Sequence, residues 1–193
     1  MKLLGTIVRL QVQREPLKVG KAPLREFRTD SLVPVARLLA TTAGVVGVTL
    51  DGEHVLDVHH QDHPRTRDRR GTAGFTIMSV GDYRWLESAY GLQQADQAAG
   101  NTILIDAEEP LAFRDFSAGL IVRTEGGDLD LDQVRVADPC VEFSRFCMGL
   151  RPDSVIDGPV LHTLSELDHG RRGYRGQVAG EGLIAVGDRV FAR

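Results

Sequence analysis

Cysteine is scarce in this chain, whose 193 residues contain only Cys140 and Cys147. A chain of this length can bury a sufficient core without disulfide or metal cross-links, so the fold needs no covalent stapling. Two cysteines also fall short of the four thiolates that hold an iron–sulfur cluster. Because disulfide-rich composition is typical of secreted proteins, the low cysteine content favours a cytoplasmic location.

An excess of basic residues is lacking as well. Lys and Arg total 23 against 27 Asp and Glu, which gives a formal net charge of −4. Since these charges are spread along the chain, no basic face is expected that could follow a nucleic-acid backbone. The composition therefore argues against nucleic acid as a partner.

Long apolar runs are also lacking. Arg9 interrupts the opening MKLLGTIVRL and no cleavage site follows, so this stretch predicts a first strand rather than a signal peptide. Residues 32–50 are the only candidate for a membrane span, but they contain Pro34 and Arg37. An Arg in mid-membrane costs roughly 2.5–3.5 kcal/mol, so we expect a soluble protein without a membrane partner.

The sequence does contain a series of short segments rich in Val, Ile and Thr. Runs such as GVVGVTL, GFTIMSV and NTILI are separated by Gly, Pro and Asp, which favours strands over helices. No repeat or long linker divides the chain, so we predict one mainly β, barrel-like domain over residues 1–193. In DLDLDQVRV the apolar alternation slips by one residue between Leu131 and Val134, which predicts a bulge.

Three short helices are predicted between these strands. Residues 80–90 follow a Ser-x-x-Asp capping box, and residues 159–169 begin with a proline and end at a glycine. The third runs from Pro139 to Gly149 with Asp138 as its N-cap.

The chemistry expected of Cys140 depends on that third helix. In a first helical turn the thiol would lie near unpaired N–H groups, which favour the thiolate that binds metals or attacks electrophiles. Cys147 would lie about 10 Å further along the axis at ~1.5 Å per residue, whereas bridged Cα atoms are ~4.4–6.8 Å apart. A disulfide is thus excluded. The residues alone leave open that Cys140 is a small buried apolar residue, and they favour that interpretation for Cys147.

Two Arg-rich segments are candidates for anion binding. HHQDHPRTRDRR, residues 59–70, contains three His and four Arg, which suit metal ligation and bidentate phosphate recognition. HGRRGYRG places Arg171, Arg172 and Arg175 between glycines that permit close backbone approach to a ligand. The alternatives are a solvated connector for the first segment and a tight turn for the second. No HExxH motif or dinucleotide fingerprint accompanies them.

Taken in order, several motifs resemble the MOSC domain family, the β-barrel domain named after the C-terminal part of molybdenum cofactor sulfurases. They are AGVVGVTLDGEHVLDVHHQDH, the Gly100–Asn101 pair, the Pro139–Cys140 pair, GRRGYRGQV and the closing GLIAVGDRVF. The resemblance covers most of residues 40–193. It implies a MOSC-like β-barrel with a few short peripheral α-helices.

The same resemblance implies a site for the molybdenum cofactor, with Cys140 ligating the metal or carrying sulfur. The residues then expected to bind the cofactor are His59, His60, Arg70, Asn101, Arg171, Arg172 and Tyr174. The chain departs from the family's His-Gly-Gly and Gly-Glu-Asn patterns at residues 59–62 and 99–101.

Three functions follow as alternatives from that implied site. The first is a molybdenum-dependent oxidoreductase that reduces N-hydroxylated compounds with electrons from a separate donor protein. The second is a non-catalytic carrier of cofactor, or of sulfur as a Cys140 persulfide. The third is a degenerate module that binds some other anion.

Overall fold

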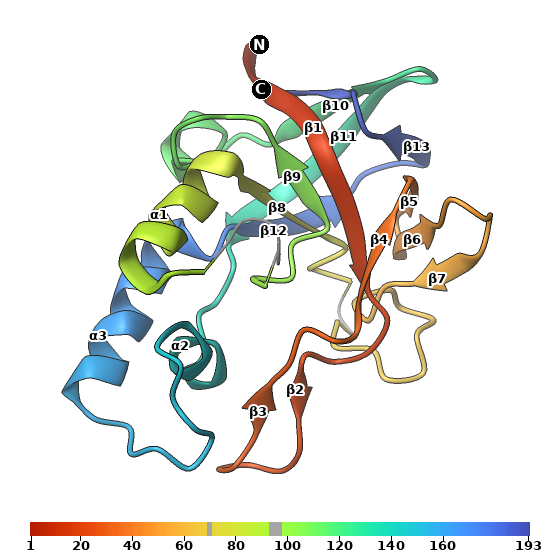
Figure 1. The fold of residues 1–193 in the computed structure, drawn as a ribbon. Coiled ribbons are helices and arrows are strands. Elements are labelled where there is room, and N and C mark those ends of the chain that lie inside the picture. Colours follow the sequence, from red (N-terminus) through yellow and green to blue (C-terminus); the bar gives the residue numbers. More distant parts are fainter. Residues whose placement is uncertain (69–70, 93–97) are drawn as a thin grey trace.

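The computed structural model describes residues 1–68, 71–92 and 98–193, and these residues are mainly β (Figure 1). The strands are β1 (Lys2–Gln13), β2 (Lys18–Val19), β3 (Glu26–Phe27), β4 (Leu32–Val35), β5 (Arg37–Thr41), β6 (Gly44–Val48), β7 (His54–Leu56), β8 (Phe75–Ser79), β9 (Ile103–Ile105), β10 (Leu120–Thr124), β11 (Gly127–Val136), β12 (Tyr174–Val178), β13 (Gly182–Ala185) and β14 (Arg189–Ala192). The helices are α1 (Val80–Tyr90), α2 (Val141–Cys147) and α3 (Gly158–Glu166), with a 3-10 turn at Phe113–Asp115 and a π-helical segment at Leu167–Arg171.

Within the described residues, seven strands close into a mixed barrel. Their order is β14-β10-β11-β12-β8-β9-β1, and β14 pairs back onto β1. All of these neighbours are antiparallel except β8 and β9, which run parallel. A second sheet has the order β13-β5-β6-β7. The predicted mainly β barrel with short peripheral helices is confirmed.

Strand β1 links three parts of the structure. It pairs in turn with β14, β9 and β4 along its length, and it leads into the β2–β3 hairpin. The opening stretch is therefore a strand, as predicted. Residues 32–50 form β4, β5 and β6 instead of one apolar span. Among the described residues, no helix is both long enough and apolar enough to cross a bilayer.

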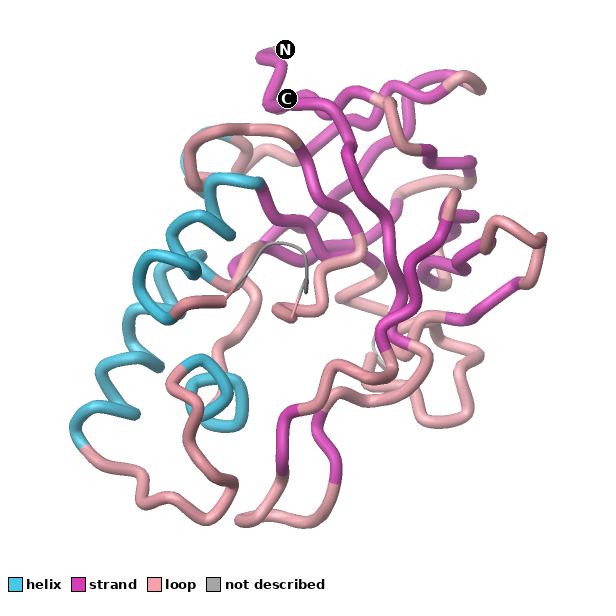
Figure 2. Tube along the Cα trace, in the orientation of Figure 1, coloured by secondary structure: helices cyan, strands magenta, loops and turns pink. Residues whose placement is uncertain are grey.

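The core has two parts. The barrel interior is filled by residues such as Ile77, Leu120, Leu131 and Val190, all almost fully buried. A second cluster lies between the barrel and the helices, which gather on one side of the strands in Figure 2. Its members include Met78, Tyr83, Phe143, Cys147 and Leu167. The helices are therefore held mainly by their apolar faces.

The predicted bulge lies in β11. The β11–β12 register shifts between Asp132 and Arg135, and Gln133 takes a left-handed φ of 50°. Two predicted helices also match closely. Helix α1 has the expected capping box, and α3 begins after an Asp157 N-cap with a proline in its first turn.

The third predicted helix starts too early. Helix α2 begins at Val141, and Cys140 is its N-cap residue with φ −147° and ψ 151°. The expectation that Cys140 lies inside the first turn was therefore wrong. The reason is that Asp138 does not cap: its carboxylate pairs with Arg175 and its carbonyl accepts a hydrogen bond from Arg172.

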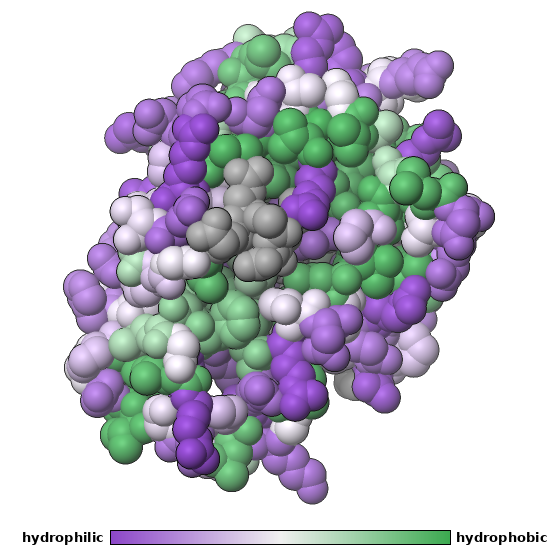
Figure 3. Space-filling model, viewed as in Figure 1, coloured by the Kyte–Doolittle hydropathy of each residue, from purple (hydrophilic) through white to green (hydrophobic). Residues whose placement is uncertain are grey.

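The face of the molecule in Figure 3 mixes polar and apolar side chains, and one apolar area lies at its lower left, where Figure 1 places α3. Helix α3 exposes Leu161, and the loop before it exposes Val155 and Ile156.

Candidate functional site

A cavity of about 250 Å³ lies beside the barrel, where six separate chain segments meet. These segments are the end of β1 with the following hairpin, the loop after β7, the strand β8, the turn before β9, and the β11 and β12 ends. The lining residues are Gln13, Pro16, Leu17, Lys18, Phe27, His59, Arg67, Ala73, Thr76, Ala99, Gly100, Asn101, Ala137, Asp138, Pro139, Arg172 and Arg175.

Among the charged groups that line the cavity, cations outnumber anions. Lys18, Arg67, Arg172 and Arg175 line it, against the single carboxylate of Asp138 among the described lining residues. Guanidinium groups suit bidentate recognition of phosphate and carboxylate oxygens. The charge of the lining therefore complements that of an anion.

Arg175 reaches the cavity from β12. Its Nη2 pairs with Asp138, while its buried Nε has no hydrogen-bond partner within the described residues. Burial lowers the pKa of Arg175 and the nearby Asp138 opposes that effect. The side chain remains charged near neutrality because the ordinary pKa of arginine lies far above neutral pH.

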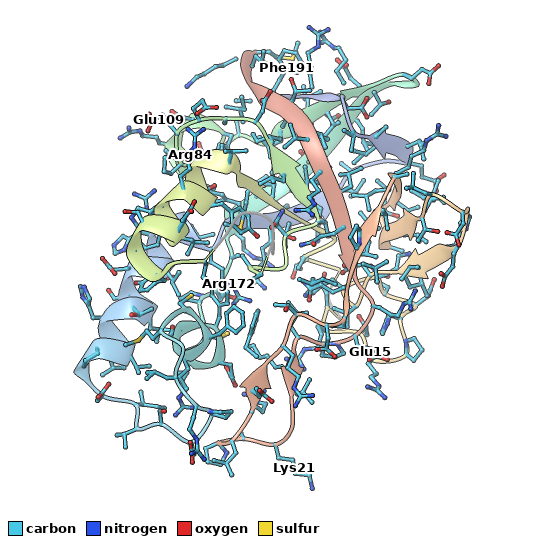
Figure 4. The ribbon with its side chains drawn as sticks, in the orientation of Figure 1. Glu15, Lys21, Arg84, Glu109, Arg172 and Phe191 are labelled. Carbon is cyan, nitrogen blue, oxygen red and sulfur yellow. The ribbon has the colours of Figure 1, made fainter. Side chains whose placement is uncertain are left out.

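Arg172 joins Cys140 to this cavity. Its Nη1 lies 3.4 Å from Cys140 Sγ and donates a hydrogen bond to the Asp138 carbonyl at 3.0 Å. The guanidinium also stacks over Phe143 of α2, 4.8 Å from the ring centroid. Figure 4 shows Arg172 between the barrel strands and α2. The thiol itself is half-buried. It contacts Arg172 but is not among the residues that line the cavity.

The two cysteines have different surroundings, and both are free. Cys147 is packed in the cluster beneath the helices, where burial raises the pKa of its thiol to about 12. A thiol with that pKa is protonated at neutral pH, and protonated thiols are poor ligands and nucleophiles. The prediction that Cys147 is a core residue and forms no disulfide with Cys140 is confirmed.

His59 is held in the cavity wall by a buried carboxylate. Asp57, which is 1% exposed, accepts hydrogen bonds from the His59 backbone N–H at 2.9 Å and lies 2.8 Å from His59 Nδ1. The other Asp57 oxygen accepts the Gln13 backbone N–H at 2.8 Å. The loop after β7 is thereby fixed to the end of β1.

Asn101 lines the cavity but is engaged by its own neighbours. Its Oδ1 accepts a hydrogen bond from Tyr83 at 2.7 Å, and its Nδ2 donates to the Ile103 carbonyl at 3.0 Å. Next to it, Gly100 has a φ of 78° and accepts a hydrogen bond from Gln13 Nε2 at 2.7 Å. A Cβ at Gly100 would lie 2.7 Å from Leu17, so this turn requires glycine.

The remaining predicted residues lie elsewhere. His60 is buried beside Gly44, and Arg171 stacks 5.2 Å from the Trp85 ring. Tyr174 is in the barrel interior and donates a hydrogen bond to the Leu111 carbonyl at 2.9 Å. Arg70 lies outside the described residues. The structure thus brings His59, Asn101 and Arg172 together at the cavity, with Cys140 adjoining.

Sequence reasoning missed Gln13, Lys18 and Asp57, and it assigned Asp138 to capping. Asp57 carried a local signal, because an Asp two residues before a His commonly closes a turn with its side chain. Gln13 and Lys18 carried none, because their place in the cavity depends on the path of the hairpin after β1.

This protein is similar to known proteins in its fold and not in its sequence. No sequence family profile matches the chain, and no curated protein sequence matches it. A solved structure described as a hypothetical protein superposes with a TM-score of 0.53 at 13% identity, over 97% of this chain and 68% of the other. YiiM from Escherichia coli, a MOSC-domain protein, superposes with a TM-score of 0.52 at 14% identity, over 100% of this chain and 71% of YiiM. The chain has a MOSC-like fold.

YuaD from Bacillus subtilis is also similar, with a TM-score of 0.49 at 12% identity over 98% of this chain and 93% of YuaD. At sequence identities of 13–14% the structural likeness concerns the fold alone.

Proposed function

We propose that this MOSC-like protein binds the molybdenum cofactor in the cationic cavity, with the Cys140 thiolate as the protein ligand to the metal. One observation carries the proposal: Arg172 both lines the cavity and lies 3.4 Å from Cys140 Sγ. Thiolates are the soft ligands that such metals accept, and a guanidinium N–H can donate a hydrogen bond to one.

The lining residues fit the chemical groups of that cofactor. Its phosphate-bearing pterin is anionic, and Lys18, Arg67 and Arg175 supply the matching cations. The Nε of Arg175 has no hydrogen-bond partner among the residues that the structure describes. Among the described residues no three His, Cys, Asp or Glu side chains cluster as a metal site. A metal held here would therefore depend on one thiolate and on ligands that the cofactor itself brings.

The reaction we propose is the two-electron reduction of N-hydroxylated compounds, in which the N–O bond breaks and water leaves. The bound cofactor would supply a metal that accepts and returns two electrons. The chain's own residues bind the anion, hold the thiolate and limit access to the cavity. The electrons must come from a separate donor protein, because the two cysteines of this chain cannot hold an iron–sulfur cluster.

A second candidate, a sulfur carrier, is favoured by the position of Cys140. Its thiol contacts Arg172 and is not among the residues that line the cavity. A persulfide would extend the side chain by one S–S bond, about 2.05 Å, and would carry its outer sulfur away from the backbone. In that case Arg172 would stabilise a persulfide anion, and no substrate would be reduced.

Elemental analysis distinguishes these functions. The wild type, Cys140→Ser and Cys147→Ser are purified from a host that makes molybdenum cofactor. We expect near-stoichiometric molybdenum in the wild type and in Cys147→Ser, and its loss in Cys140→Ser. Absence of molybdenum in all three proteins, with cyanide-labile sulfur that disappears only in Cys140→Ser, would support the carrier instead. Absence of both signals would leave an anion-binding module and would overturn both candidates.

A further inference from the structure

Hydrogen bonds fix the loop after β7. They hold one edge of the His59 imidazole against the Asp57 carboxylate. Asp57 Oδ2 accepts the Gln13 N–H at 2.8 Å, and the Val58 N–H donates to the Gln13 carbonyl at 2.8 Å. The Arg67 N–H closes the loop onto the Val58 carbonyl at 2.9 Å. These bonds leave the Asp57 side chain no freedom to turn, since it is buried and both of its oxygens accept hydrogen bonds.

The position of Asp57 sets the tautomer of His59. Asp57 Oδ1 lies 2.8 Å from His59 Nδ1, and a carboxylate oxygen accepts, so Nδ1 must carry the hydrogen. Nε2 is on the opposite edge of the ring. Because His59 lines the cavity and its Nδ1 edge faces buried Asp57, the Nε2 edge faces the cavity. Within the described residues Nε2 has no hydrogen-bond partner.

The cavity that His59 lines is surrounded by charged side chains from several chain segments. The charged groups around the cavity are Lys18 from the hairpin, Arg67 from the same loop, Asp138 after β11, and Arg172 and Arg175 at the start of β12. By contrast, His60 next in sequence is buried and its Nδ1 accepts the Asp62 N–H at 3.2 Å. Of these two neighbours, His59 alone keeps a ring nitrogen free over the cavity.

We propose that His59 is the proton donor of this cavity, a catalytic residue whose ring is set by Asp57 as a positioning residue. This inference rests on the proposed reduction of N-hydroxylated compounds. As the N–O bond breaks, two electrons from the donor protein pass to the substrate. For this step the ring first takes up a proton from solvent at Nε2, so that both ring nitrogens carry hydrogen. Nε2–H then gives that proton to the departing oxygen, which leaves as water, and a second proton from solvent reaches the nitrogen. The imidazolium is stabilised by Asp57 until Nε2 gives up its proton, and solvent then restores it.

A merely structural role for the pair is the competing interpretation. The Asp57–His59 contact could serve only to fix the loop, because the backbone N–H of His59 also binds the same Asp57 oxygen at 2.9 Å. The two roles differ in what they predict for the ring. A loop anchor needs only the Asp57 side chain, whereas a proton donor needs Nε2.

The tautomer can be measured without any turnover. Nitrogen-15 NMR of the imidazoles in the full-length wild type should show neutral His59 protonated at Nδ1, the minor tautomer of free histidine. Asp57→Asn should shift His59 toward the Nε2–H form, as removal of a partner carboxylate does in a serine protease triad. A wild-type His59 with the Nε2–H tautomer, or one unchanged in Asp57→Asn, would overturn the assignment.

Turnover measurements then test whether His59 donates a proton to the substrate. The probe is benzhydroxamic acid, reduced to benzamide and water by reduced methyl viologen, with the purified holoprotein. We expect His59→Gln to lower kcat by about 100-fold or more, with KM within about threefold and molybdenum content unchanged. His54→Gln, an exposed position on β7, is the matched control and should behave as wild type.

The outcomes separate this inference from the proposed function. Wild-type protein without molybdenum contradicts the proposed function, and the proton-transfer step falls with it; the metal content reveals this before turnover is measured. Wild type with molybdenum but with equal activity in His59→Gln overturns the inference alone. So does a variant in which KM rises and kcat is unchanged, because His59 would then be a binding group only.

Discussion

The barrel interior and the cavity beside it are built in opposite ways. The interior takes apolar side chains from successive hydrogen-bonded strands, and nearly all of them are buried. The cavity takes charged and polar side chains from segments that are distant in sequence, such as Lys18, His59 and Arg175. Strand β12 serves both regions: Tyr174 points into the barrel and Arg175 into the cavity. Since neighbouring strand residues face opposite sides, the two regions share a backbone but can be altered separately.

The largest expected effect is on stability, from the barrel interior. Leu131 is fully buried and pairs with Leu120 and Val178 on the neighbouring strands. Leu131→Ala leaves a cavity among strands and should lower the free energy of unfolding by about 2–5 kcal/mol, measured by urea denaturation. Leu183→Ala, at an exposed position of β13, is the control and should change it far less.

The cavity should be unaffected by that change. Below the unfolding midpoint, the Leu131→Ala protein should bind inorganic phosphate as the wild type does. A loss of phosphate binding that parallels the loss of stability would mean that the two regions are coupled. It would contradict the inference that the barrel interior and the cavity can be altered separately.

Much of the barrel could be predicted from the sequence because its signals are local. Alternation marked the strands, the phase slip before Val134 marked the bulge, and the Ser79 capping box marked the start of α1. Each of these depends on neighbours within a few residues. The third helix was placed too early because Asp138 is engaged by Arg175, a residue 37 positions away.

The cavity could be predicted only in part because it depends on which strands pair. Cys140 meets Arg172 because β11 and β12 are neighbours, joined near the site by the Ala137 N–H to the Gly173 carbonyl at 3.0 Å. Nothing in either segment alone indicates this contact. Tyr174 was grouped with its Arg neighbours by motif, whereas strand alternation puts it on the other face.

A smaller effect is expected from the cavity side of β12, and it should appear in binding. Arg175→Met removes a guanidinium but keeps a similar volume. We expect inorganic phosphate to bind at least about tenfold more weakly by calorimetry, the effect of losing a hydrogen bond to a charged group. Stability should change by less than about 1 kcal/mol, since the ion pair with exposed Asp138 is worth little.

Arg123→Met is the matched control for that variant. Arg123 pairs with Asp128 at 2.9 Å on the β10–β11 hairpin and lies outside the cavity lining. It should lower phosphate affinity little. Equal weakening by both variants would show that phosphate affinity depends on the net charge of the protein rather than on the cavity.

The smallest effect is expected where the two regions meet, at the bulge of β11. Gln133 is exposed and has a left-handed φ of 50°, a conformation that costs most L-residues roughly 1–2 kcal/mol and glycine nothing. Gln133→Gly should therefore raise the free energy of unfolding by about 0.5–1 kcal/mol in urea, after allowance for glycine's greater entropy in the unfolded chain. Gln177→Gly, in the extended β12 strand opposite Asp132, should lower it by about the same amount. Destabilisation by both would contradict the left-handed bulge. Opposite signs would show that β11 turns at Gln133, which carries the strand from the barrel to the residues that line the cavity.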